Sequence, residues 1–354
     1  MPTKIEWAEE SWNPVTGCTP VSEGCENCYA ARMAKRLAGR AGYPADDPFK
    51  VTLHPERLEQ PLKWRKPRRI FVCSMGDLFH PDVPFWFVCQ VMAIVAACPQ
   101  HQFLFLTKRA VAMHDYFTAS LPLEFELPEA AKELGVLDKI PGKKTPWPPK
   151  NIWLGVTAEN QARADERIPV LLSIPAAVHF VSIEPCLGPV NIEKPIGAIG
   201  NRTNFVLEQA VGQPRILAAC PECEGTRYFQ TDPHIEYCSA CGGTGWGLDW
   251  IILGGESGPG ARPVHPDWVR SVRDQCQAAG VPFFFKQWGE WIADEMELPG
   301  EGPRSRPEPY RWFPPQKEKG ESIGTCCYRV GKKEAGRELD GRTWEQYPAV
   351  TEVE

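Results

Sequence analysis

Short apolar runs that end on polar or glycine residues constrain the fold of this chain more than any other feature. They are rich in β-branched and aromatic residues and lie at 68–80, 101–109, 151–160, 178–188, 249–258 and 281–291. Nearly continuous apolar runs of this length are typical of strands buried on both faces, as in a parallel sheet covered by helices. The sequence therefore predicts an α/β fold.

Amphipathic stretches separate most of these runs. Residues 267–280, for example, follow Pro266 and end at Gly280, which are typical flanks of a helix. With one further strand before Cys18, the pattern predicts a parallel (β/α) barrel, complete or partial. An open doubly wound sheet is the alternative, because it produces the same periodicity.

The 354 residues divide where this pattern changes. Residues 1–199 are expected to form the first part of the barrel, and 248–291 its last β/α units. Residues 200–247 hold a separate group of cysteines and are expected to be an inserted zinc-ribbon-like module. Residues 292–354 begin with a Pro- and Gly-rich segment that is expected to be irregular, and continue as a C-terminal extension.

Cysteine content and charge indicate a reducing compartment and limit the kinds of partner. The chain has 14 cysteines and begins with a polar stretch instead of an apolar leader. Its longest apolar stretch, 84–98, is too short to span a bilayer and predicts a buried helix. We therefore expect a cytoplasmic protein of a bacterium or a phage-infected host, with no membrane partner. The net charge of −6 argues against a uniformly basic nucleic-acid-binding protein.

The cysteines of the 200–247 segment have the spacing of a structural zinc site. Two Cys-x2-Cys pairs, separated by fourteen residues, are formed by Cys220, Cys223, Cys238 and Cys241. Each pair can form a tight knuckle, and two knuckles complete a tetrahedral site with four thiolates. Such a site has no open position, so we expect the zinc to stabilise the inserted module.

Polar residues follow each apolar run. Because active sites of β/α folds lie at the carboxyl ends of the strands, we expect these residues to form one polar mouth. Carboxylates stand at four of the strand ends, namely Asp77, Glu159, Glu184 and Glu256.

Three cysteines follow the expected first strand within one loop. Cys18, Cys25 and Cys28 are one ligand short of a closed tetrahedral site and directly precede a predicted helix. Three thiolates suit a [4Fe–4S] cluster in which one iron has no protein ligand. The alternatives are a zinc site completed by a distant residue such as Cys73 or His80, or thiols packed in the core.

The chain resembles the radical S-adenosylmethionine (SAM) enzymes. More narrowly, it resembles a phage-associated family of three-Cys-motif proteins, also found in bacteria, through most of its length outside 200–247 and 292–325. The matching segments are WNPVTGCTPVSEGCENCYAARMAKRL, SMGDLFHPDVP, FLFLTKR, NIWLGVTAEN, FVSIEPCLGPV, WIILGGESGPGARP, FFFKQWGEW and VGKKEAGRELDGRTW. The commonest radical-SAM loop is Cys-x3-Cys-x2-Cys, whereas the first gap here holds six residues.

This resemblance implies a mechanism and its cofactors. SAM would chelate the open iron, and an electron from a donor such as flavodoxin or ferredoxin would release a 5′-deoxyadenosyl radical. The protein would position that radical and exclude water.

The resemblance also implies roles for the strand-end residues. Asp77 with Ser74 would bind the methionyl ammonium group, and Thr157 with Glu159 the ribose or the carboxylate. Glu184 and Glu256 would contact SAM or the substrate. Two thiols near the mouth, Cys73 and Cys186, would either return a hydrogen atom to a product radical or simply pack in the core.

Basic segments with neighbouring tryptophans suggest the substrate. They lie at 31–40, 63–69, 107–109 and 328–337. Cations and stacking aromatics suit a phosphate backbone and unpaired bases, although solvated helix faces and core tryptophans produce the same pattern. Together with the likeness to spore photoproduct lyase-type enzymes, they lead us to expect a nucleic-acid base or a modified nucleotide, with DNA, RNA or a nucleotide as partner. Two other classes stay open: a non-catalytic, metal-stabilised nucleic-acid-binding protein, and a barrel hydrolase that uses two strand-end carboxylates.

Overall fold

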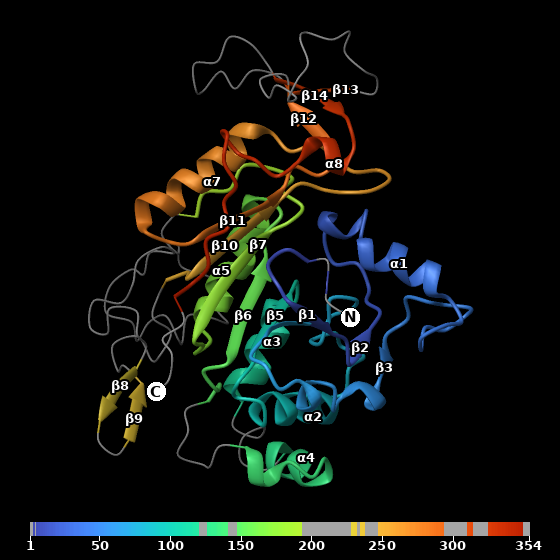
Figure 1. Cartoon of the computed structure of the whole chain (residues 1–354), viewed down its shortest axis with the longest axis vertical. Helices are drawn as coiled ribbons and strands as arrows, with labels where there is room; N and C mark the ends of the chain where they lie inside the picture. Colours follow the sequence, from blue (N-terminus) through green and yellow to red (C-terminus); the bar gives the residue numbers. More distant parts are fainter. Residues whose placement is uncertain are drawn as a thin grey trace.

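The computed structural model describes most of the chain (Figure 1). The described residues are 3, 5–119, 126–140, 147–192, 247–293, 310–313 and 325–349, with the strands at 228–231 and 234–237. The four cysteines expected to bind zinc, Cys220, Cys223, Cys238 and Cys241, lie outside these residues.

A seven-stranded parallel sheet forms the centre of the protein. Its strands, in spatial order, are β1 (Glu10–Trp12), β4 (Arg69–Val72), β5 (Gln102–Thr107), β6 (Ile152–Thr157), β7 (Val178–Ile183), β10 (Trp250–Gly254) and β11 (Phe283–Gln287). Spatial order follows chain order throughout, whereas a doubly wound sheet reverses its order at a switch point. The sheet is therefore a half-barrel, and the expectation of a partial parallel barrel is confirmed.

Most of the helices cover the outer face of the half-barrel. The described helices are α1 (Tyr29–Leu37), α2 (Phe85–Ala96), α3 (Ala110–Thr118), α4 (Leu127–Glu133), α5 (Gln161–Leu172), α7 (Pro266–Ala279) and α8 (Lys332–Ala335). Short 3₁₀ turns lie at Glu23–Cys25, Pro55–Arg57, Pro61–Lys63 and Leu137–Lys139. The helices predicted after Cys28, within 84–98 and within 267–280 are confirmed. The last of them ends where Gly280 adopts a φ of 70°, as its sequence predicts.

The two faces of the sheet bury different cores, because successive side chains of a strand point to opposite sides. The outer face packs against the helices through residues such as Ile70, Phe103 and Leu154. The inner face carries an aromatic core that includes Phe71, Leu104, Trp153, Phe180, Trp250 and Phe284. Apolar burial on both faces explains why the strand sequences read as continuous apolar runs.

Both ends of the chain pack onto the open side of the half-barrel. Trp7 lies in the inner core with only 2% of its surface exposed, and its ring centroid is 4.6 Å from that of Phe71. From the C-terminal segment, Tyr347 packs on Trp250 with ring centroids 5.3 Å apart. These contacts fill the open side of the half-barrel with aromatic side chains.

Smaller sheets surround the main one. They are β2 (Val15–Thr16) with β3 (Thr52–Leu53), β8 (Tyr228–Thr231) with β9 (His234–Tyr237), and β12 (Trp291–Ala293) with β14 (Thr325–Arg329) and β13 (Tyr310–Phe313). The described parts of 292–354 thus contain an antiparallel sheet and helix α8 in addition to irregular chain. None of the described helices combines the length and the apolar character that crossing a membrane requires.

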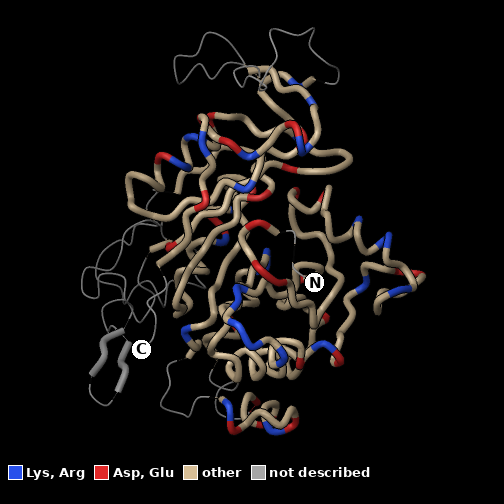
Figure 2. Tube along the Cα trace, viewed as in Figure 1, with Lys and Arg blue, Asp and Glu red and all other residues tan. Residues whose placement is uncertain are grey.

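Basic and acidic residues are interspersed along the described chain (Figure 2). The basic positions of α1, among them Lys35 and Arg36, form one exposed group. Recognition of nucleic acid by such segments stays a prediction.

Candidate functional site

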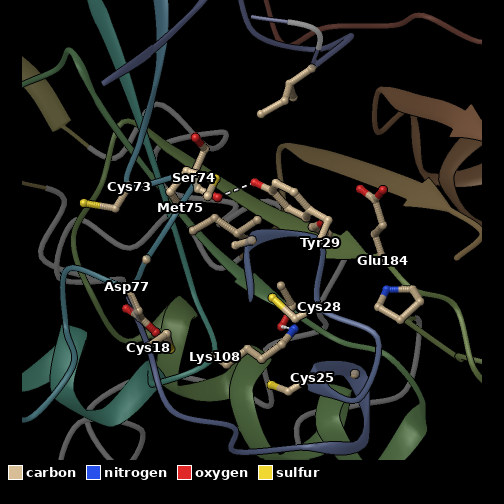
Figure 3. A pocket seen from close by; sticks show the side chains of 18 of the residues that line it. Cys18, Cys25, Cys28, Tyr29, Cys73, Ser74, Met75, Asp77, Lys108 and Glu184 are labelled. Carbon is tan, nitrogen blue, oxygen red and sulfur yellow. Dashed lines mark hydrogen bonds between the residues drawn. The ribbon is translucent and has the colours of Figure 1, made fainter. Parts of the chain in front are cut away.

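A cavity of about 590 Å³ opens at the carboxyl end of the half-barrel (Figure 3). Its wall combines the cysteine loop and α1 with the ends of strands β4, β5, β6, β7, β10 and β11. Cys18, Cys25 and Cys28 all line it. The three cysteines therefore share one cavity with strand-end polar groups, among them Asp77, Thr157, Glu184 and Glu256.

The cysteine loop begins with a backbone turn that only glycine fits well. Gly17 has a φ of 86°, and a Cβ there would lie 2.1 Å from the carbonyl oxygen of Lys50. Cys28 then occupies the position that precedes the first residue of α1. All three loop cysteines are free thiols with part of their surface exposed. The loop thus presents unpaired sulfurs to the cavity.

The separation between metal-binding side chains distinguishes a site for one metal ion from a site for a cluster. Among the described residues, no three or more His, Cys, Asp or Glu side chains lie close enough to bind one metal ion. Neither Cys73 nor His80 therefore joins the loop cysteines in a single-ion site. His80 instead pairs with the hydroxyl of Thr19, with Nε2 and Oγ1 2.8 Å apart. In a [4Fe–4S] cluster each thiolate binds a different iron, so its ligands stand further apart than those of one ion.

Asp77 positions Arg109 against the first cysteine. The carboxylate of Asp77 accepts hydrogen bonds from Nη1 of Arg109 at 2.9 Å and from the hydroxyl of Thr107 at 2.9 Å. The same Nη1 donates to Sγ of Cys18 at 3.3 Å. Burial, followed by the charge of Asp77, raises the pKa of the Cys18 thiol, and Arg109 only partly offsets them. Asp77 therefore holds a cation beside Cys18, in addition to lining the cavity.

Glu159 lies beneath the loop and does not line the cavity. Its side chain is fully buried and accepts from Lys108 at 2.7 Å, from Arg167 at 2.9 Å and from the hydroxyl of Ser22 at 2.7 Å. Burial opposes its charge, but Lys108 and Arg167 outweigh this effect, so the pKa of Glu159 is lowered. Because Ser22 lies between Cys18 and Cys25, this carboxylate anchors the middle of the loop.

Glu256 holds the last part of the loop. It accepts from Nη2 of Arg262 at 2.8 Å and from the amide of Asn27, next to Cys28, at 3.1 Å. Arg262 also donates to the backbone carbonyl of Glu23 at 2.9 Å. Burial disfavours the carboxylate, yet the hydrogen bonds from Arg262 lower its pKa. Glu256 thus lines the cavity while its charge is neutralised by Arg262.

Glu184 occupies another wall of the cavity (Figure 3). It accepts from Nζ of Lys286 at 2.7 Å, and its side chain keeps 23% of its surface exposed. Burial lowers the pKa of Lys286, but the charge of Glu184 outweighs it and raises the pKa overall. This pair faces the cavity without serving the cysteine loop.

Two more predicted residues, Ser74 and Thr157, line the cavity. Ser74 donates to the side-chain oxygen of Asn13 at 3.2 Å, and its backbone carbonyl accepts from the hydroxyl of Tyr29. Thr157 accepts from Nζ of Lys108 at 2.8 Å. In Figure 3, Tyr29 extends from the start of α1 toward Ser74.

The two further thiols differ in position. Cys73 lines the cavity, but its sulfur lies against the backbone of Val15, and burial raises its pKa to about 12. Cys186 is buried outside the lining and donates to the carbonyl of Gly188 at 3.5 Å; burial raises its pKa to about 12. These positions favour the packing role for Cys186, which has no face on the cavity.

Sequence reasoning missed the cations that neutralise the carboxylates. Lys108, Arg109 and Lys286 are the partners of Glu159, Asp77 and Glu184, respectively. A usable signal was present, because each cation ends a strand one or two places from its carboxylate in the sheet order. Arg262 and Asn27, which contact Glu256 from loops, carried no such signal.

The fold and the site together define an α/β half-barrel protein with a three-cysteine loop over a ligand-sized cavity at the carboxyl ends of its strands. The chain belongs to a family of proteins of unknown function, DUF5131, whose model matches residues 2–348. No curated protein and no solved structure matches it.

Proposed function

We propose that this protein is a radical SAM-type iron–sulfur enzyme. The observation that carries the proposal is that Cys18, Cys25 and Cys28, three unpaired thiols of one loop, line the same cavity as the strand-end polar groups. An iron without a protein ligand is useful only where a substrate-sized space adjoins it. The cavity of about 590 Å³ lies within the range of ligand pockets, roughly 300–1,000 Å³.

The residues present fit a cluster with three protein ligands. The sulfurs come from a loop that carboxylates and arginines hold at its start, middle and end, so the ligand set is positioned before any cluster binds. In the proposed cluster these three cysteines would be the protein ligands, and the fourth iron would be left open to SAM. When bound, the cluster and SAM supply the electron transfer and carbon–sulfur cleavage that generate a 5′-deoxyadenosyl radical.

The residues of the chain position these groups and exclude water. Arg109 lines the cavity beside Cys18 and would bind the carboxylate of SAM; Asp77 holds that guanidinium in place. Glu184, the partly exposed carboxylate of the cavity, would accept from the methionyl ammonium group or from a substrate N–H. Ser74 and Thr157 would contribute hydroxyl groups to the same ligand.

The proposal includes a substrate class and partners. We assign a nucleic-acid base or a modified nucleotide as the substrate, because a cavity that combines apolar side chains with strand-end polar groups suits a flat ring that carries hydrogen-bonding groups. Flavodoxin or ferredoxin would supply the electron, in a reducing cytoplasm where free thiols persist. A zinc ion on Cys220, Cys223, Cys238 and Cys241 would stabilise the inserted module.

The state of the carboxylates argues against a hydrolase. A general acid needs a raised pKa, whereas the pKa values of Glu159 and Glu256 are lowered by their cationic partners. Asp77 is engaged by Arg109 and Thr107. These groups are therefore poorly suited to exchange protons with a substrate near neutral pH.

The experiment that tests this proposal is anaerobic purification with iron, sulfide and zinc analysis. We expect about four irons per chain and a visible absorption band typical of such clusters, both lost in Cys18→Ala, Cys25→Ala and Cys28→Ala. Cys98→Ala, at a buried thiol outside the cavity, is the matched control and should keep the iron. Iron that survives substitution of all three loop cysteines would refute the proposal.

A further inference from the structure

The wall formed by β7, β10 and β11 carries a partly buried charge pair that the cysteine loop does not use. Glu184 follows β7 and Lys286 lies on β11, with β10 between them. They meet at 2.7 Å beside Gly254, which ends β10 without a side chain. A Cβ on Gly254 would lie 3.4 Å from both the carboxyl carbon of Glu184 and Cβ of Lys286. A larger side chain there would separate the pair.

The backbone also brings Lys286 to this position. The pairing of β10 with β11 runs from Leu253–Phe285 to Gly254–Gln287, so Lys286 is an extra residue at a register shift. Such irregularities re-aim side chains and are frequent beside active sites. Both members of the pair line the cavity, and each keeps a part of its side chain exposed.

The charges of this wall balance. Lys286 lies 4.0 Å from the carboxylate of Glu6, and Lys332, which also lines the cavity, lies 3.3 Å from it. Two lysines therefore face two glutamates. A wall without net charge has little attraction for a phosphate or a free carboxylate, but it still offers ammonium donors and carboxylate acceptors.

Trp7 adds a donor with no acceptor at the bottom of the same cavity. Its side chain is 2% exposed and lines the cavity, and its indole N–H has no hydrogen-bond partner among the described residues. Trp7 also packs on Phe71, another lining residue, at 4.6 Å between ring centroids. Buried indole N–H groups normally find an acceptor, so this donor is available to an oxygen or nitrogen atom of a ligand.

We propose that this wall binds a neutral cyclic amide, the ring N–H of which donates to Glu184 while ring carbonyl oxygens accept from Lys286 and Trp7. The inference rests on the proposed function, and it narrows the substrate to rings with a lactam or imide edge, such as uracil or hypoxanthine. An adenine-type ring lacks that edge, because its ring nitrogens accept and have no adjacent carbonyl. The aromatic floor of Trp7 and Phe71 favours a planar ring over an open-chain amide.

The test is calorimetric titration of the full-length, anaerobically purified protein, without reductant. Uridine and inosine should bind at least about tenfold more tightly than 3-methyluridine, 1-methylinosine and adenosine, because blocking the ring N–H leaves Glu184 without its donor. Inorganic phosphate should not compete. Equal affinity for uridine and 3-methyluridine, or displacement of uridine by phosphate, would overturn the proposal.

Variants locate the binding on this wall. Glu184→Gln removes the negative charge that balances Lys286, so uridine should bind more weakly and the anionic analogue orotate more tightly. Trp7→Phe keeps the aromatic ring without its N–H and should also weaken uridine. Glu26→Gln, at a carboxylate that is 64% exposed and outside the cavity lining, is the control and should change neither affinity. Thermal unfolding of each variant checks the fold, and a Glu184→Gln protein that keeps full uridine affinity contradicts the assignment.

These titrations separate the inference from the radical chemistry. They need no SAM cleavage, so selective binding of uridine in a protein that forms no 5′-deoxyadenosine supports the ring site and refutes only the proposed function. Conversely, SAM cleavage without discrimination between uridine and 3-methyluridine refutes the ring site and leaves the enzyme class standing.

Discussion

The two walls of the cavity use charged strand-end residues in different ways. Around the cysteine loop, Asp77 and Glu256 on the cavity wall and Glu159 beneath it are each neutralised by an arginine or lysine, and the resulting pairs hold the loop. On the opposite wall, Glu184 and Lys286 pair with each other and stay in contact with the cavity. A polar residue at a strand end can thus serve as scaffold or as ligand contact, and only its neighbours distinguish the two.

The largest difference between the walls should appear in stability. Glu159→Gln leaves Arg167 buried beside a neutral amide, and breaking a buried ion pair in this way costs about 3–5 kcal/mol. Glu166→Gln, which breaks a partly exposed pair with Arg163, should cost under about 1 kcal/mol. Urea unfolding monitored by circular dichroism measures both. Equal losses in the two variants would mean that Glu159 does not anchor the loop.

A smaller loss of stability is expected from a substitution at Gly17, where the cysteine loop begins. Gly17→Ala places a methyl group 2.1 Å from the carbonyl oxygen of Lys50, in backbone of positive φ, and should destabilise the protein by about 2 kcal/mol or more. At Gly135 the φ is 66° and a Cβ would meet no atom within 4 Å. Gly135→Ala should therefore cost only the backbone strain of a non-glycine residue at positive φ, about 1 kcal/mol. Thermal unfolding should therefore rank wild type, Gly135→Ala and Gly17→Ala in that order. The reverse order would contradict the close packing seen at Gly17.

Lowering the pH should reduce the stability of the protein, because a histidine is buried next to the start of the cysteine loop. His54 is 2% exposed and pairs with the hydroxyl of Thr16, just before the loop; burial, followed by Arg57, lowers its pKa. Below about pH 6.5 the unfolded chain binds a proton that folded His54 resists, so the free energy of unfolding falls as pH decreases. Unfolding midpoints between pH 7.5 and 5 should drop less in His54→Gln than in wild type. An unchanged pH dependence in the variant would assign the effect to other groups.

The smallest effect concerns the opposite wall. Glu184 and Lys286 lie partly exposed at the cavity, so Glu184→Gln should destabilise the protein by only about 1 kcal/mol while it changes ligand selectivity. Comparing its unfolding midpoint with that of Glu159→Gln shows in one experiment how much each carboxylate contributes to stability. A loss as large as that of Glu159→Gln would make Glu184 a scaffold residue as well.

Sequence patterns predicted the fold well because burial on both faces leaves a local signature. Six strands of the main sheet lie within the six apolar runs, β1 lies before Cys18 as predicted, and α7 ends just before Gly280. The distinction between half-barrel and doubly wound sheet had no such signature, because it depends on which strands become neighbours. Register between distant strands is a tertiary property.

Only part of the candidate site could be predicted from the sequence, because contacts between distant segments leave no local pattern. Carboxylates at the strand ends could be read from the sequence, and so could the cysteine loop. Whether a carboxylate is free to bind a ligand depends on the cation that meets it: Arg167, eight residues beyond Glu159, neutralises Glu159 from α5. The unpaired N–H of Trp7 likewise follows from how the N-terminal segment packs against the inner core.

Formation of 5′-deoxyadenosine tests the central claim most directly. Protein reconstituted anaerobically with iron and sulfide should, on addition of dithionite and SAM, produce 5′-deoxyadenosine and methionine, detected by chromatography and mass spectrometry. Cys18→Ala should abolish the product, and Cys98→Ala should leave it unchanged. If the reconstituted protein carries its full iron content and still yields no 5′-deoxyadenosine above the Cys18→Ala level, the radical SAM assignment is wrong.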